Sequence, residues 1–87
     1  MRFDEIWQRI VACAGQEFYM VRGESFAYKI VNEAILPSRT RYRIARSEFE
    51  KAAALPNITG PGQISQMVRG PSYVFAILTD PRIRSAI

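Results

Sequence analysis

Two short runs rich in aromatic and β-branched residues, separated by only three residues, are the feature that most constrains the fold of this chain. They are EFYMV at residues 17–21 and SFAYKIV at residues 25–31, and the connecting RGE contains a glycine. Such runs favour strands, and a short connection with glycine favours an antiparallel hairpin. In the second run Phe26, Tyr28 and Ile30 share one face. That face must be covered by another layer.

An amphipathic helix is predicted before the hairpin, over residues 2–15. Apolar side chains recur there at helical spacing, and acidic residues stand in the first turn. The apolar positions are Phe3, Ile6, Trp7, Ile10, Val11 and Ala14. We expect this stripe to cover the sheet, and a partner-binding face is the alternative.

Further extended segments follow the hairpin. Asn32 and Glu33 are expected to make a turn, and AILP at residues 34–37 begins a third run, in which Pro37 marks a strand end, an edge or a bulge. Residues 39–44 alternate arginines with other side chains. They are therefore predicted to form the last strand of a meander.

Helices are predicted after the sheet. Ser47 and Glu50 have the spacing of a capping box at the start of a helix, which Pro56 would end. A short helix is expected near residues 63–69. Another is expected to begin at Pro71 and to stop at Asp80-Pro81. The SYVFAIL segment within this last helix could alternatively form a strand.

The predicted fold class is α+β in a single domain over residues 1–87. An N-terminal helix is followed by a three- to four-stranded antiparallel β-meander, and then by two or three short helices packed on one sheet face. The best core candidates are Trp7, Phe18, Phe26, Tyr28, Ile30, Tyr42, Ile44, Phe49, Ile77 and Leu78.

The composition argues against most enzyme chemistries. The 87 residues include no histidine, so the usual general base, the common nucleophilic triads and nearly every zinc site are missing. The acids are scattered, and the single Cys13 lies in an apolar stretch typical of a buried thiol. No apolar run reaches the length of a membrane span. We expect a non-enzymatic, bacterial-type cytoplasmic protein without cofactor or metal.

The basic residues carry the main functional prediction. The net charge is +4, and no acid occurs between Glu33 and Glu48. Alternate side chains of a strand repeat about every 6.6 Å, so arginines there could meet every second phosphate of a nucleic acid. The predicted DNA or RNA contacts are Arg39, Arg41, Arg43 and Arg46, with a hydrogen bond from Ser38 or Thr40. The alternative is that these arginines are only the solvated face of a strand.

A second, shorter signal lies in LPNITGPGQI at residues 55–64. It resembles the hairpin of the helix-hairpin-helix family, in which a glycine-flanked loop presents backbone N–H groups to a phosphate. The resemblance makes Gly60 and Gly62 a candidate phosphate loop. Pro61 stands where that family has an aliphatic residue and removes one amide donor. A plain turn between helices is the alternative.

A third signal is the apolar C-terminal segment at residues 67–83. Tyr73, Phe75 and Ile83 could form an exposed patch for a protein partner or a homodimer. The alternative is that the segment is the last core element of a small domain. A protein-interaction or oligomerisation module is therefore the second functional hypothesis.

Overall fold

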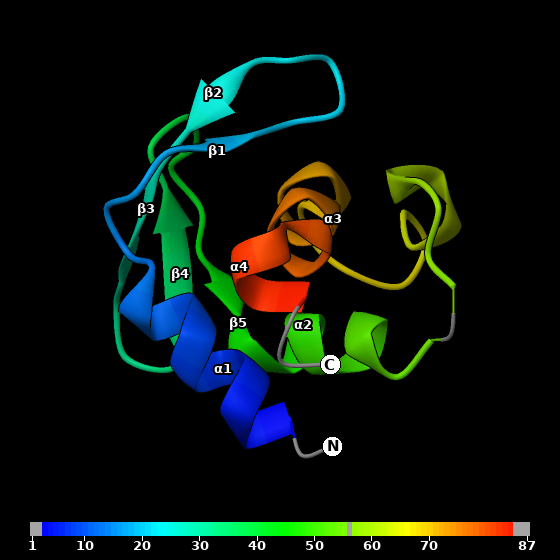
Figure 1. Cartoon of the computed structure of the whole chain (residues 1–87), viewed down its shortest axis with the longest axis horizontal. Helices are drawn as coiled ribbons and strands as arrows, with labels where there is room; N and C mark the ends of the chain where they lie inside the picture. The colour runs from blue at the N-terminus through cyan, green and yellow to red at the C-terminus, as the bar shows by residue number, and fades with distance from the viewer. Residues whose placement is uncertain (1–2, 56, 85–87) are drawn as a thin grey trace.

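The computed structural model of the protein describes residues 3–55 and 57–84. Strands β1 to β4 lie to one side of helix α3 (Figure 1). The elements are α1 (Phe3–Ala12), β1 (Phe18–Tyr19), β2 (Ser25–Phe26), β3 (Tyr28–Ile30), β4 (Ala34–Pro37), β5 (Ile44–Ala45), α2 (Arg46–Ala53), the 3₁₀ turn η1 (Pro61–Gln63), α3 (Pro71–Thr79) and α4 (Pro81–Arg84). The predicted α+β class is confirmed: a helix, antiparallel strands in two small sheets, and then short helices.

The predicted hairpin is formed by β1 and β2. The two strands pair antiparallel, with Phe18 opposite Phe26. In the connecting loop the Met20 amide donates to the Glu24 carbonyl at 2.9 Å, and the Gly23 amide donates to the Met20 carbonyl at 2.8 Å. Gly23 has φ +91°, a conformation that glycine adopts without strain. The hairpin predicted from the two sequence runs and the short connection between them is therefore confirmed.

The second sheet is a three-stranded antiparallel meander in the order β3-β4-β5. Tyr28 lies opposite Pro37, and Ile35 lies opposite both Ile30 and Ile44. The single strand predicted over residues 25–31 is divided at Ala27, where the chain passes from one sheet to the other. The division occurs because the two halves of this run have different partners, β1 and β4.

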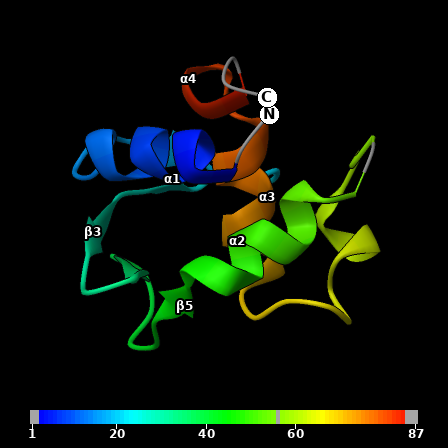
Figure 2. The same ribbon diagram turned by 90° about the horizontal axis from the view of Figure 1, so that it is seen from below.

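The helices contribute buried side chains to the interior of the protein. Helix α1 buries Ile6, Trp7 and Ile10 of the predicted stripe, whereas Val11 and Ala14 are exposed. Helix α3 begins at Pro71 and ends before Asp80, so the helical interpretation of this segment is confirmed. Helix α2 packs against α1, α3 and β5. In Figure 2, which is seen from below, α2 and α3 lie near the centre and β3 lies at the left edge.

Two details of the helix predictions are wrong. Helix α2 begins at Arg46 without a side-chain cap, so Ser47 and Glu50 form no capping box. The segment at residues 63–69 contains only the end of η1 and a series of turns. Proline and glycine at its start favour this short turn, and the apolar spacing still buries Ile64 and Val68. The predicted helix stop at Pro56 lies outside the described residues.

One hydrophobic core joins the sheets and the helices. Eight of the ten predicted core residues are buried, and the other two, Ile30 and Tyr42, are half-buried against the core. Fully buried residues that were not among these candidates include Ile10, Ile35, Ile64, Val74 and Ile83. Among residues 3–55 and 57–84, no helix has both the length and the apolar character needed to cross a bilayer.

Candidate nucleic-acid interface

The predicted arginines lie on an ordered loop, residues 38–43, which connects β4 to β5 and is here named the arginine loop. The Ser38 amide donates to the Ala27 carbonyl at 2.8 Å, and Ser38 Oγ accepts from the Ala27 amide at 3.1 Å. Thr40 Oγ1 accepts from the Tyr42 amide at 3.0 Å, and the Thr40 amide donates to the Pro37 carbonyl at 3.3 Å. Short polar side chains therefore hold the loop.

The prediction of a strand over residues 39–44 is wrong. Only Ile44 and Ala45 belong to β5, because the ladder pairs Ile35 with Ile44 and Ala34 with Ala45. The chain must reverse direction between Pro37 and Ile44, so the residues between them form the connection. The arginines therefore do not form an evenly spaced comb on one face of a strand.

Arg39 is the loop arginine that contacts the rest of the protein. Its Nη2 lies 3.4 Å from Glu24 Oε2, and its Nη1 lies 3.4 Å from the Ser25 carbonyl oxygen. Both charged side chains are about half exposed, at 47% and 49%. Such exposed ion pairs are weak and screened by salt, so Glu24 competes only modestly with another anion for Arg39.

Arg41 and Arg43 have a different environment. Both residues are exposed. Within the described ranges, neither side chain has a carboxylate or hydrogen-bond partner. The loop backbone between them is held by Tyr42, whose ring packs half-buried against the core. Two unneutralised guanidinium groups therefore project from an anchored loop.

Arg46 does not extend this basic surface. It begins α2 and forms ion pairs with Asp4 of α1 and with Glu33 before β4, the second at 3.3 Å. Its guanidinium carbon also lies 5.5 Å from the centre of the Phe3 ring and 5.8 Å from that of Trp7. Arg46 thus ties α1 to α2 and to the β3–β4 turn. Its guanidinium is thus already paired within the protein, unlike those of Arg41 and Arg43 in the described part of the chain.

Arg69 joins the basic surface, although its sequence position gave no sign of it. Its guanidinium carbon lies 4.8 Å from the centre of the Tyr42 ring, a cation–π distance. The Arg69 amide donates to Glu48 Oε1 at 2.8 Å, which positions the residue from α2. That bond, together with a stronger one from Lys51, lowers the pKa of the Glu48 carboxyl. Arg69 therefore lies beside the arginine loop, with its backbone held by a carboxylate.

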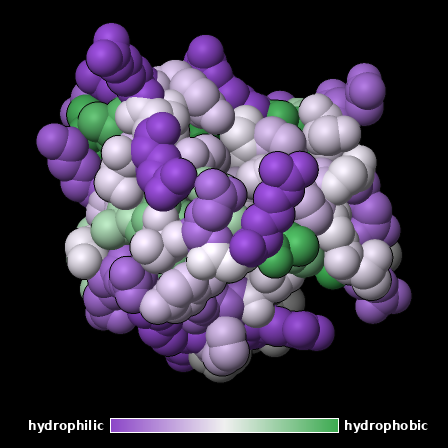
Figure 3. All heavy atoms as spheres, turned by 90° about the horizontal axis from the view of Figure 1, so that it is seen from above, coloured by the Kyte–Doolittle hydropathy of each residue, from purple (hydrophilic) through white to green (hydrophobic). Residues whose placement is uncertain are grey.

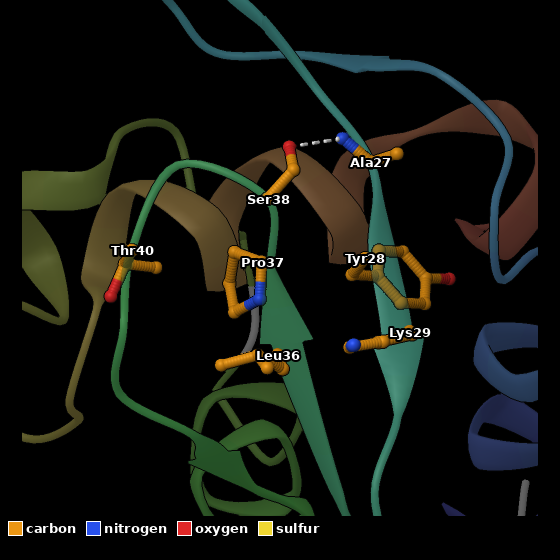
Figure 4. Close-up of a pocket in the computed structure, with 7 residues that line it drawn as sticks. All are labelled: Ala27, Tyr28, Lys29, Leu36, Pro37, Ser38 and Thr40. Carbon is orange, nitrogen blue, oxygen red and sulfur yellow. Dashed lines mark hydrogen bonds between the residues drawn. The ribbon is translucent and has the colours of Figure 1, made fainter.

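Lys29 borders a shallow groove next to the same loop (Figure 4). The groove has a volume of about 370 Å³ and lies on the outer face of β3 and β4, which is opposite the core. Lys29 is exposed and stands across the ladder from the half-buried Leu36, while Ser38 and Thr40 line the end toward the loop. Sequence analysis did not single out Lys29, because only strand pairing brings it to this edge.

The candidate phosphate loop at Gly60 and Gly62 is largely occupied by its own side chains. Gln63 Oε1 accepts hydrogen bonds from the amides of Thr59 and Gly60, the latter at 3.2 Å. Gly60 has extended backbone, with φ −169°, and an added Cβ at either glycine would meet no atom within 4 Å. A phosphate would have to displace Gln63 to reach these two donors.

The predicted C-terminal interaction patch is not exposed as expected. Ile83 is fully buried, and Tyr73 and Phe75 are half-buried against the core. The Tyr73 ring meets Phe26 edge-on at 5.0 Å, and burial raises the pKa of its hydroxyl. Figure 3 shows one face of the protein, where hydrophobic residues form small separate groups among hydrophilic ones. Ile83 is therefore excluded from a surface patch, because a domain this small needs such residues in its core.

Within the described ranges, no three histidine, cysteine, aspartate or glutamate side chains gather in a way that could hold a metal ion. Comparisons with protein families, with curated proteins and with solved structures found no match to this chain. The basic surface around the arginine loop is therefore the candidate that the residues themselves best define.

Proposed function

We propose that this protein is a small non-enzymatic nucleic-acid-binding protein that recognises the phosphate backbone through its arginine loop. The observation that carries the proposal is the contrast among its arginines. Arg46 and Arg82 form ion pairs with carboxylates of the same chain, whereas Arg41 and Arg43 are exposed and without such partners among the described residues. Guanidinium groups suit this role because their planar fork donates two hydrogen bonds to one phosphate.

The flanking residues extend the proposed surface. Arg39 is weakly paired, Arg69 is stacked on Tyr42, and Lys29 is exposed on the adjacent strand. The Ser38 and Thr40 oxygens already accept backbone amides, so their hydroxyl protons are free to donate to phosphate oxygen. The proposed contact is thus a cationic surface rimmed by donors, which reads charge rather than base sequence. The absence of any membrane-length apolar run and the lone buried Cys13 support the accompanying proposal of a cytoplasmic location.

A salt titration with paired charge variants tests the function. Fluorescence anisotropy would follow a labelled 15-base-pair DNA duplex and its separated single strand between about 50 and 200 mM salt. Arg41→Ser combined with Arg43→Ser is expected to reduce the log–log salt slope by about 1.8 on duplex or about 1.4 on single strand. Each of these reductions in the slope corresponds to the loss of two phosphate contacts.

The matched control removes the same charge elsewhere. Arg22→Ser combined with Arg84→Ser also lowers the net charge by two, and both guanidinium groups lack a partner in the described part of the chain. Arg22 lies in the β1–β2 loop and Arg84 in α4. The proposal requires that this control retain most of the wild-type slope. Equal losses in the two double variants, or no binding to either probe at low salt, would refute it.

A further inference from the structure

The groove beside the arginine loop has a chemistry that goes beyond attraction of phosphates. Its accessible lining combines the apolar side chain of Leu36 with the stem of Lys29, and Figure 4 shows Thr40 turning its methyl group toward Pro37. Pro37 itself is fully buried beneath this surface. The groove is therefore a small apolar depression rather than a purely charged one.

The polar side chains of Lys29, Ser38 and Thr40 around the groove can each donate a hydrogen bond. The Lys29 ammonium has no partner among the described residues and carries only donors. The hydroxyl groups of Ser38 and Thr40 each accept a backbone amide, which leaves the proton of each free to donate. Among residues 3–55 and 57–84, no acidic side chain lines the groove. Its occupant should therefore offer an apolar surface together with hydrogen-bond acceptors.

The position of the groove relates it to the basic surface. Thr40 lines the groove and is followed directly in the chain by Arg41, so the two Cα atoms are about 3.8 Å apart. The groove and the exposed Arg41 are therefore adjacent in the chain. The charge complementarity favours an occupant whose apolar part is attached to an anionic chain.

We infer that the groove takes an unpaired base of a single-stranded nucleic acid, while Arg41 and Arg43 hold the adjoining phosphates. An unstacked base offers a flat apolar face and acceptor atoms on its edge, whereas in a duplex the faces are stacked and hidden. This inference rests on the proposed function, because the arginines bring the strand to the groove. It adds that single strands are bound more tightly than an abasic chain of equal charge.

The test compares probes that differ only in their bases. The probes are labelled oligo-dT of twelve nucleotides and a twelve-unit abasic oligonucleotide with the same number of phosphates. The wild-type protein is expected to bind oligo-dT at least about fivefold more tightly than the abasic probe. Leu36→Ala is expected to weaken oligo-dT binding about two- to fivefold, and Leu36→Phe to tighten it by a similar factor, since a ring is a better stacking surface.

The controls separate this inference from the function on which it rests. Neither Leu36 variant should change binding of the abasic probe, and Val21→Ala, at an exposed residue of the β1–β2 loop, should change neither probe. Circular dichroism would establish that each variant is folded. Equal affinities for the two probes, or equal effects of the Leu36 variants on both, overturn the groove assignment. If the groove assignment fails in this way but the Arg41 and Arg43 double variant still binds both probes more weakly than the wild type, the proposal of phosphate binding stands. If neither probe binds at low salt, both proposals fall.

Discussion

Gly70, at the start of helix α3, is the position where one added methyl group should disturb both the backbone and the core. It has φ +62° and ψ +51°, in the left-handed region. A Cβ at this position would lie 2.6 Å from Cδ1 and 3.2 Å from Cγ1 of Ile44, and 3.3 Å from the Tyr42 hydroxyl. Ile44 is fully buried in β5, so its side chain has little room to move.

Two separate effects determine the expected loss of stability in Gly70→Ala. A side chain in the left-handed conformation costs about 1–2 kcal/mol. Forcing a buried isoleucine to shift in a packed core costs a further amount of about 1–2 kcal/mol. The variant should therefore lose about 2–4 kcal/mol in free energy of unfolding, which lowers the Tm of a domain this size by at least about 10 °C.

Urea unfolding followed by circular dichroism would measure this loss, with Gly23→Ala as the backbone control. Gly23 also has positive φ, but an added Cβ there meets nothing within 4 Å, so only the conformational effect of about 1–2 kcal/mol is expected. Ile44→Val removes the Cδ1 atom that lies closest to the added methyl group. This second change should cost less in the Gly70→Ala background than in the wild type, with a coupling of at least about 0.5 kcal/mol.

The reasoning is refuted if Gly70→Ala loses no more stability than Gly23→Ala. Additive effects of Gly70→Ala and Ile44→Val would also count against it, because they would show that the side chain of Ile44 adjusts without cost.

Two further predictions concern polar groups that support the fold. The Tyr28 hydroxyl donates to the Ile10 carbonyl at 2.5 Å in the interior, and burial raises its pKa, so it remains a donor at physiological pH. Tyr28→Phe should lower the free energy of unfolding by about 1–2 kcal/mol, which urea unfolding would measure. Hydrogen bonds from Arg82 hold the pKa of Asp80 below its usual value of 3.8. The ionised Asp80 therefore stabilises the folded protein above pH 3.8, and this stabilisation is lost as the pH falls through the lowered pKa. Asp80→Asn should lower the Tm at neutral pH, and its Tm should then fall less than that of the wild type between about pH 5 and pH 2; an unchanged acid-induced fall would show that other carboxyls control it.

The local elements of the fold could be predicted because their signals lie within a few residues. The apolar spacing of α1, the two runs around Gly23 and the start of α3 at Pro71 each specify a structure by steric and periodic rules. Most of the core followed from the same patterns. Some of the missed core residues, such as Val74, lie in α3, where hydrophobic side chains occur on several faces.

The candidate site could be predicted only in part. The acid-free window directed attention to the arginine loop, but alternation of residues over six positions fits either a strand or a hairpin connection. Pairing of Ile35 with Ile44 decided between them. Arg69 reaches the loop by stacking on Tyr42, a residue far from it in sequence, and no local pattern signals that contact.

By itself, the sequence determined the α+β class, the hairpin, the helical faces and an excess of positive charge near residues 39–46. Only the tertiary structure decided what each arginine does. Arg43 and Arg46 are three positions apart, yet Arg43 remains exposed while Arg46 is held by Asp4, 42 residues away, and by Glu33. The physical reason is that periodicity depends on the chain's own geometry, whereas the neutralisation of a charge depends on which distant carboxylates the fold brings within a few ångströms.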